Sequence, residues 1–162
     1  MPDPPVPFRI ATEADAYALL DLERAANLAA LGHVFPPERY PFPDDAVLSR
    51  WVLVLAEEGV DVLVVDGPDG LSCFAAHDDC WLRHLAAHPD HWRRGLGRTA
   101  VDVVTARMAR RGAREASLWC LEENARARRL YEHLGWWPAG ERREAPWPPH
   151  PVEMRYTRRL ER

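Results

Sequence analysis

The sequence predicts an α/β fold in a single domain that spans residues 1–162. Two features of the chain predict this class. Segments with apolar residues at every third or fourth position, as in amphipathic helices, share the chain with short apolar and β-branched runs bounded by turn formers. A chain of 162 residues is also long enough to bury a hydrophobic core without help from a metal or a disulfide.

The charge balance and the composition narrow the classes of function. The 25 acidic and 21 basic residues give a formal net charge of -4, which provides no overall attraction for nucleic acid. No apolar stretch has the length of a membrane helix, and residues 1–5 lack the regions of a signal peptide. The 3 cysteines have no C-x-x-C spacing and are expected to be reduced thiols. We therefore expect a cytoplasmic protein that binds no metal, nucleic acid or membrane.

The first quarter of the chain predicts two helices separated by a loop. Thr12 followed by Asp15 is typical of a helix start, so a first helix is expected over 12–31. Four prolines among aromatic residues predict an ordered loop over 33–43. A second helix, capped by one of two aspartates, is expected over 44–55.

The rest of the chain alternates strands with helices. A β-branched run at 62–65 is followed by the turn formers of 66–70, which predicts a hairpin at the start of an antiparallel meander. Apolar residues at helical spacing predict a helix from 98 to Gly112, and Gly135 is expected to stop another helix. The expected strands are 60–65, 71–77, 81–87, 117–121, 136–142 and 152–158, and the last helix is 125–134.

The segment 88–98 carries the first functional signal, because it leaves a strand, turns through glycines and opens a helix. Gly95 and Gly97 leave room for a ligand, and the helix start contributes about half a positive charge, so a phosphate-like anion fits this turn. The pattern is neither a Walker loop nor a dinucleotide fingerprint, since the lysine of the first and one glycine of the second are missing. An ordinary tight turn is the alternative interpretation.

The glycine turn and a second segment, 117–136, together resemble the GNAT superfamily of acyl-CoA-dependent N-acyltransferases. The turn is similar to the R/Q-x-x-G-x-G/A pyrophosphate loop of that family, except that Trp92 stands where arginine or glutamine is usual. The second segment resembles the family's strand, then N-x-x-A/R, then L-Y-x-x-x-G-F/W. The resemblance implies a mixed, central V-shaped sheet of six or seven strands flanked by four main helices.

The resemblance also implies acetyl-CoA as co-substrate and assigns expected roles to residues of this chain. Asn124 would bind the pantetheine arm, and Tyr131 would protonate the leaving sulfur, with a packed helix tyrosine as the alternative. Backbone groups of the strand end would bind the pantetheine and the thioester, and the turn would hold the pyrophosphate. These two groups of residues are Leu85, Ala86 and Ala87, and Arg93, Arg94, Gly95, Leu96, Gly97 and Arg98.

The sequence does not single out a general base. Trp81, Arg83 and Trp119 occupy positions where the family often has a carboxylate or a histidine. Strand parity points His84 to the opposite face from Arg83 unless a bulge turns it. Deprotonation through ordered water is a further alternative, and the other candidate side chains are His33, Glu38, His77, Asp78 and Asp79.

The acceptor is expected to lie between the first two helices and the last strand loop. Aromatic residues and prolines would form a stiff apolar wall there, although they can equally cover the sheet; the candidates are His33, Phe35, Tyr40, Phe42, Trp147 and His150. The expected activity is transfer of an acetyl group from acetyl-CoA to a primary amine of a small molecule. The alternatives are a non-catalytic acyl-CoA-binding or regulatory module and an acetyltransferase of protein N-termini. The sequence does not determine the oligomeric state, and a homodimer is one of the alternatives.

Overall fold

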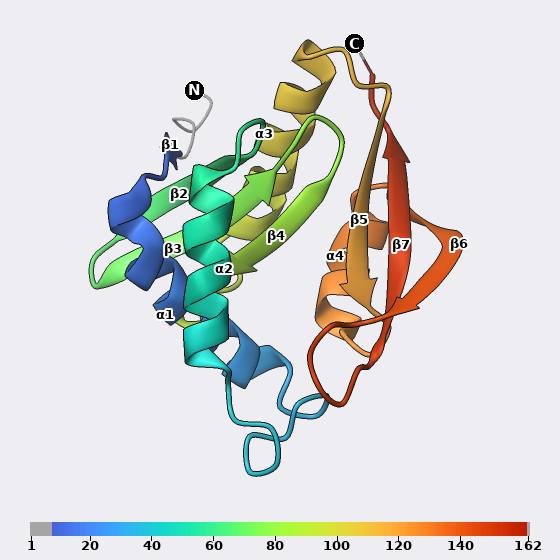
Figure 1. The fold of residues 1–162 in the computed structure, drawn as a ribbon. Coiled ribbons are helices and arrows are strands. Elements are labelled where there is room, and N and C mark those ends of the chain that lie inside the picture. Colours follow the sequence, from blue (N-terminus) through green and yellow to red (C-terminus); the bar gives the residue numbers. More distant parts are fainter. Residues whose placement is uncertain (1–7, 162) are drawn as a thin grey trace.

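The computed structural model describes residues 8–161, and the segment 1–5, whose sequence lacks the regions of a signal peptide, lies outside this range. Within residues 8–161 the chain forms seven strands and four α-helices, as expected (Figure 1). The strands are β1 (Arg9–Ile10), β2 (Asp61–Gly67), β3 (Gly70–His77), β4 (Leu82–Ala87), β5 (Glu115–Leu121), β6 (Trp137–Glu144) and β7 (Val152–Arg159). The helices are α1 (Ala16–Ala30), α2 (Asp44–Ala56), α3 (Leu96–Arg110) and α4 (Ala125–His133), with 3-10 turns at Glu13–Asp15 and Pro89–His91.

The strands form two antiparallel sheets that diverge from each other. The first has the order β1-β2-β3-β4 and the second the order β5-β7-β6. Trp81, just before β4, makes a parallel bridge to Ser117 in β5, and beyond this bridge the two edge strands separate (Figure 1). The expected V-shaped sheet therefore consists of two antiparallel halves joined at this bridge.

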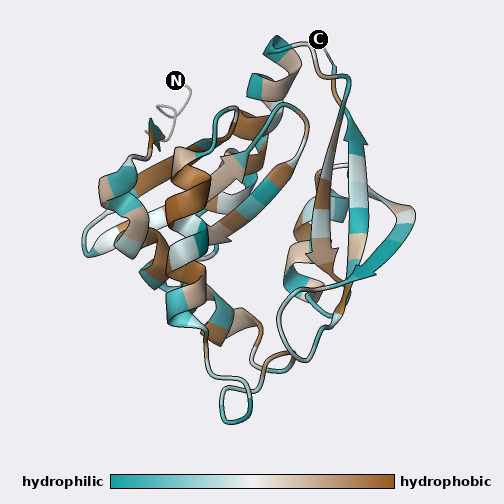
Figure 2. Ribbon diagram, in the orientation of Figure 1, coloured by the Kyte–Doolittle hydropathy of each residue, from teal (hydrophilic) through white to brown (hydrophobic). Residues whose placement is uncertain are grey.

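Helices cover both faces of the first sheet. α1 and α2 lie on one face, where Trp51 of α2 meets Phe74 of β3 edge to face at 4.9 Å between ring centroids. α3 lies on the other face and buries Val101, Val104 and Met108, the residues whose spacing predicted this helix. Figure 2 shows the hydrophobic residues concentrated on these layers. No helix within residues 8–161 is long and apolar enough to cross a membrane.

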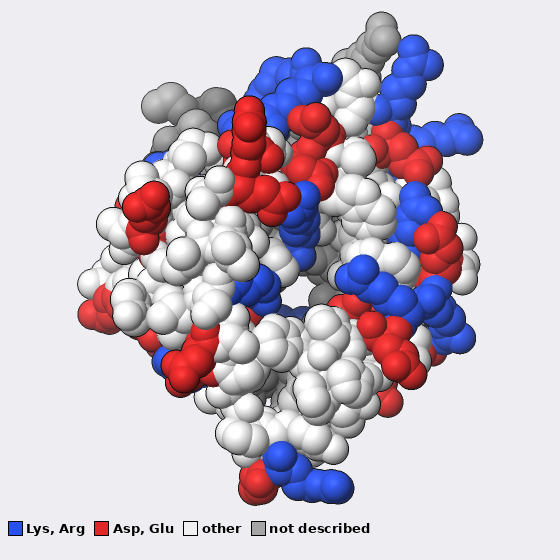
Figure 3. Space-filling view, viewed as in Figure 1, with Lys and Arg blue, Asp and Glu red and all other residues white. Residues whose placement is uncertain are grey.

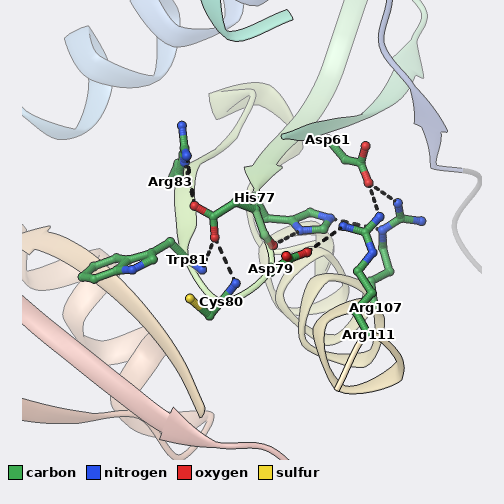
Figure 4. Close-up of polar contacts among 9 residues, drawn as sticks. Asp61, His77, Asp79, Cys80, Trp81, Arg83, Arg107 and Arg111 are labelled. Carbon is green, nitrogen blue, oxygen red and sulfur yellow. Dashed lines mark hydrogen bonds and ion pairs between the residues drawn. The ribbon is translucent and has the colours of Figure 1, made fainter. Parts of the chain in front are cut away.

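A β-bulge in β4 decides which side chains reach each face of the sheet. Ala76 pairs with His84 and His77 pairs with Leu82, so Arg83 is an extra residue with no partner on β3. Asp78 fixes this region, since its carboxylate accepts hydrogen bonds from the Trp81 backbone N–H at 2.7 Å and from Arg83 Nε at 3.0 Å (Figure 4). The bulge shifts the alternation of the strand by one residue.

Candidate active site

A cleft of about 290 Å³ lies where β4 and β5 separate. Both are edge strands of their sheets, so backbone groups on their facing sides are free of ladder hydrogen bonds. Figure 3 shows the molecule hollowed at its centre, between the two halves, with cationic side chains near the opening. Several residues predicted for the coenzyme line this cleft: Leu85, Ala86, Ala87, Asn124 and Tyr131, together with Trp92 and Trp119.

The glycine turn lies next to the cleft, at the start of α3. Arg93 and Gly95 have φ angles of 68° and 76°, in the left-handed region. Alternating left-handed residues and a helix start direct successive N–H groups toward one point, which is an anion-binding arrangement. Within residues 8–161 the backbone N–H groups of residues 93–98 donate no hydrogen bond to protein. The donors that the sequence predicted for a pyrophosphate are therefore free.

The two glycines of the turn serve different geometric needs. A Cβ atom added at Gly97 would lie 3.3 Å from Leu130 Cδ2, so Gly97 allows α3 to approach α4 closely. A Cβ atom at Gly95 would meet no atom within 4 Å. Gly95 is required by its left-handed backbone rather than by lack of space.

Trp92, which departs from the family pattern, links the strand end to α4. Its indole Nε1–H donates to the Ala87 carbonyl oxygen at 2.9 Å, and the Arg126 guanidinium lies 3.8 Å from the centroid of its ring. Burial and the neighbouring Arg93 and Arg129 lower the pKa of Arg126. Trp92 therefore keeps a structural contact at the cleft and places a guanidinium beside it.

Asn124 caps α4 and still has a free amide group. Its side-chain oxygen accepts a hydrogen bond from the Ala127 N–H at 3.2 Å. Its Nδ2 donates to no acceptor within the described chain, and the residue lines the cleft. One side chain can thus fix the helix start and offer a donor to a ligand.

Two substitutions separate these roles of Asn124. Asn124→Ala should lower the free energy of unfolding by about 1 kcal/mol, because the cap is lost. Asn124→Ser keeps a capping oxygen, so its stability should stay close to that of the wild type, whereas its affinity for acetyl-CoA should fall about fivefold. Urea denaturation and calorimetric titration measure the two effects. Unchanged affinity in both variants would limit Asn124 to the cap.

Tyr131 is both a core residue and a cleft residue. Its ring packs against Trp136 and Tyr156, at centroid distances of 6.0 and 6.2 Å, and the residue is 7% exposed. Its hydroxyl makes no hydrogen bond to another described residue. Burial, and to a smaller extent Cys120, raises the pKa of Tyr131 well above its ordinary value, so the phenol stays protonated at neutral pH.

The positions where the family often has a base are filled by stacked aromatic and cationic groups. Trp81 and Trp119 stack with centroids 6.1 Å apart, and Arg143 lies 4.3 Å from the Trp119 ring. Arg83 also lines the cleft, and its guanidinium pairs with Asp78 and with Glu57, each at 3.0 Å.

The other acidic and histidine candidates at this end of the sheet are also engaged. His77 is fully buried, its Nδ1 bonding the Asp78 carbonyl oxygen at 2.8 Å and its Nε2 accepting from Arg107 at 3.1 Å (Figure 4). Asp79 pairs with Arg111 at 3.7 Å. None of the three candidates His77, Asp78 and Asp79 lines the cleft.

His84 is turned into the cleft by the bulge at Arg83, so strand parity without a bulge gives the wrong face for this residue. The centroid of its ring lies 5.3 Å from the centroid of the Trp51 ring, on the side of the sheet that α1 and α2 cover. Burial, then Arg50 and Arg83, lowers the pKa of His84 to about 3. The imidazole is therefore neutral at physiological pH and keeps an unprotonated nitrogen.

The lowered pKa of His84 predicts a loss of stability in mild acid. The unfolded chain takes up a proton near pH 6.5 that the folded chain refuses until about pH 3, so the free energy of unfolding falls as the pH falls between these values. The slope is about 1.4 kcal/mol per pH unit for one such group, and buried His77 adds in the same direction. Between pH 6 and 5, His84→Gln should reduce this slope by about 1.4 kcal/mol per pH unit, which is the contribution of one proton. Urea denaturation across this range tests it, and an unchanged slope would contradict it.

A second cavity, of about 310 Å³, adjoins the cleft under the loops that follow α1 and β6. Four of the residues predicted for the acceptor line it: Phe35, Tyr40, Phe42 and Trp147. His33 and His150 do not line it. Their rings bond the carbonyl oxygens of Glu123 and Ala145, each at 2.9 Å. Glu38 does not line it either.

Two residues of α1, Glu23 and Asn27, line both cavities, and sequence reasoning did not identify them. Their spacing of four residues puts them on one face of the helix, which was the available signal. The sequence alone could not show that this face meets the end of the cleft.

Comparison with known proteins agrees with this geometry. The model of the Acetyltransferase (GNAT) family matches residues 17–136. The chain therefore belongs to the GNAT family of acetyltransferases and is an acyltransferase. No curated protein matches its sequence.

Several solved structures share the fold at low sequence identity. A GCN5-related N-acetyltransferase from Rhodopseudomonas palustris is 17% identical, with a TM-score of 0.78 and 99% of each chain covered. The PaiA N-acetyltransferase from Thermoplasma acidophilum, solved in complex with coenzyme A, is 14% identical, with a TM-score of 0.72 and 95% of this chain and 98% of that chain covered. A ribosomal-protein alanine N-acetyltransferase from Escherichia coli is 22% identical, with a TM-score of 0.71 and 96% and 94% covered.

Proposed function

We propose that the protein transfers the acetyl group of acetyl-CoA to a primary amine of a small molecule. The observation that carries this proposal is the turn 93–98, whose free N–H groups lie at the start of α3 beside a cleft between two edge strands. The amine nitrogen forms a bond to the thioester carbon while the carbon–sulfur bond breaks. The neutral amine gives up one proton to solvent water, and the coenzyme thiolate takes one proton from a general acid, which solvent then reprotonates.

The residues around the cleft supply the groups that this reaction needs. The edge of β4, over Leu85, Ala86 and Ala87, offers N–H donors for the thioester oxygen and groups for the pantetheine arm. The Asn124 amide adds a donor on the opposite wall. Tyr131, kept protonated by burial, gives its proton to the leaving sulfur.

The turn suits the diphosphate of the coenzyme. Arg93, Arg94 and Arg98 are exposed around the bare N–H groups and add positive charge. The structural relative from Thermoplasma acidophilum, solved with coenzyme A, supports the choice of ligand. The buried free thiols Cys73 and Cys120 suit a reducing compartment such as the cytoplasm.

A second candidate function is acyl-CoA binding without catalysis, as in a regulatory module. The stacked pair of Trp81 and Trp119, which stands where the family often has a base, favours it. Acetylation of protein N-termini is less well supported, because aromatic residues and prolines line a small cavity on the acceptor side.

Two measurements test the proposal. Isothermal titration with acetyl-CoA should show binding, and its absence at high micromolar ligand would remove the proposal. Release of free coenzyme A in the presence of a panel of amines then separates an enzyme from a binding module. Binding without release for any amine would favour the module.

A further inference from the structure

The carboxylate of Glu23 lies at the junction of the two cavities, and only one of its two oxygen atoms accepts hydrogen bonds from the described residues. Its Oε1 atom accepts hydrogen bonds from Arg50 and from Trp51 Nε1, the latter at 3.0 Å. Its Oε2 atom accepts none from the residues that the structure describes. A carboxylate has about four acceptor sites, so Glu23 can take an N–H donor from a ligand.

The neighbours of Glu23 suit an amine that must become a nucleophile. Arg50 pairs with Glu23 and balances its negative charge. The positive charge of a bound ammonium is therefore only weakly stabilised at this position. The nearby guanidinium favours loss of a proton from a bound ammonium to solvent water, which leaves the neutral form that attacks a thioester. Neutral His84, on the cleft side of Trp51, adds no competing positive charge.

The rest of the second cavity is mostly apolar. Its other polar lining residues are Asn27 and Arg39, whose guanidinium lies 5.7 Å from the centroid of the Tyr40 ring. Phe35, Tyr40, Phe42 and Trp147 form aromatic walls, and Leu28 and Val47 add aliphatic surface. Glu23 is the single acid among the described lining residues, so a polyamine would find no partner for a second ammonium. A volume of about 310 Å³ is at the small end of the range for ligand pockets.

From these contacts we infer the chemical class of the acceptor, an inference that rests on the acetyltransferase function proposed above. The acceptor is a primary amine on a compact aromatic or branched apolar body. The body occupies the second cavity, and the amine donates an N–H to Glu23 Oε2 at the mouth of the cleft. Glu23 acts as a substrate-binding residue, and the aromatic wall sets the specificity.

Calorimetric titration of small amines into the protein saturated with coenzyme A tests the inference without requiring turnover. The probes are 2-phenylethylamine, ethanolamine, which replaces the ring by a hydroxyl, and 2-phenylethanol, which replaces the amine by a hydroxyl. We expect 2-phenylethylamine to bind at least tenfold more tightly than either analogue, because only this probe has both groups.

Variants separate the two parts of the site. Glu23→Gln should weaken binding of 2-phenylethylamine about tenfold and binding of 2-phenylethanol, which has a single O–H donor, by a smaller factor. Tyr40→Ala should weaken both. The matched control is Asp21→Asn, because Asp21 has an exposed carboxylate on the same helix and lines neither cavity. This variant should change the binding of neither probe. Thermal unfolding verifies that each variant is folded.

The outcomes distinguish this inference from the function on which it rests. If coenzyme A does not saturate the wild-type protein, the proposed function fails, and the inference fails with it. If the coenzyme binds but ethanolamine binds as tightly as 2-phenylethylamine, the apolar acceptor is wrong. Equal binding of 2-phenylethylamine to the wild type and to Glu23→Gln, while Tyr40→Ala weakens it, would overturn the role of Glu23.

Discussion

Replacing Tyr131 by phenylalanine should lower kcat about 100-fold while the affinity for acetyl-CoA changes less than twofold. The substitution keeps the ring that packs against Trp136 and Tyr156 and removes only the hydroxyl. General acid catalysis contributes about 10²- to 10⁴-fold, and the lower end applies because a thiol with an ordinary pKa near 8.5 leaves readily. Steady-state release of coenzyme A and calorimetric titration measure the two quantities.

The matched control for this prediction is Tyr156→Phe. Tyr156 is a fully buried tyrosine whose hydroxyl bonds Arg128 at 3.0 Å and Glu132 at 2.9 Å, and it does not line the cleft. Its loss should reduce stability by about 1 kcal/mol per hydrogen bond and leave kcat near that of the wild type. If Tyr131→Phe retained full turnover, Tyr131 would be a packing residue only.

A negative charge placed at Gly95 should abolish most of the coenzyme affinity. The added Cβ atom meets no other atom within 4 Å, so Asp or Asn fits, and both residues tolerate the left-handed conformation better than other side chains. Two like charges about 4 Å apart repel by about 1 kcal/mol in water and about 4 kcal/mol near a protein surface. We therefore expect Gly95→Asp to bind acetyl-CoA about 100-fold more weakly than Gly95→Asn does.

This pair of variants isolates charge from backbone strain. Both substitutions cost a similar amount of stability, about 1 kcal/mol, because both lose the freedom of glycine at the same φ angle. The affinity difference between them therefore reports the electrostatics of the turn, and calorimetric titration at low salt measures it. Equal dissociation constants for Asp and Asn would show that the diphosphate binds elsewhere.

The helices and hairpins of this chain were predictable because their signals are local. Thr12 and Asp15 form the capping box that their spacing predicts, with the Thr12 N–H bonded to Asp15 Oδ2 at 2.8 Å. Gly135 has a φ angle of 87° just beyond the end of α4, as expected of a helix-terminating glycine. The glycine turn was also readable, since a strand end, two glycines and a helix start are neighbours in the sequence.

The parts that the sequence did not predict depend on contacts between distant segments. The bulge that turns His84 toward the cleft has no sequence signature of its own, because Asp78 fixes it through the Trp81 backbone and the Arg83 side chain. Glu23 became a site residue only when packing brought α1 to the end of β4. Period and propensity describe one element at a time, so they cannot locate such a junction.

A crystal structure of the protein with bound acetyl-CoA would show whether the segment 93–98 holds the diphosphate. We expect diphosphate oxygens at about 2.7–3.2 Å from several backbone nitrogens of this segment, a normal hydrogen-bond distance. We also expect the thioester to lie along β4, on the same side as the Tyr131 hydroxyl. A coenzyme bound with its diphosphate away from this segment, and with the N–H groups of 93–98 left to solvent, would show that the turn is not the coenzyme site.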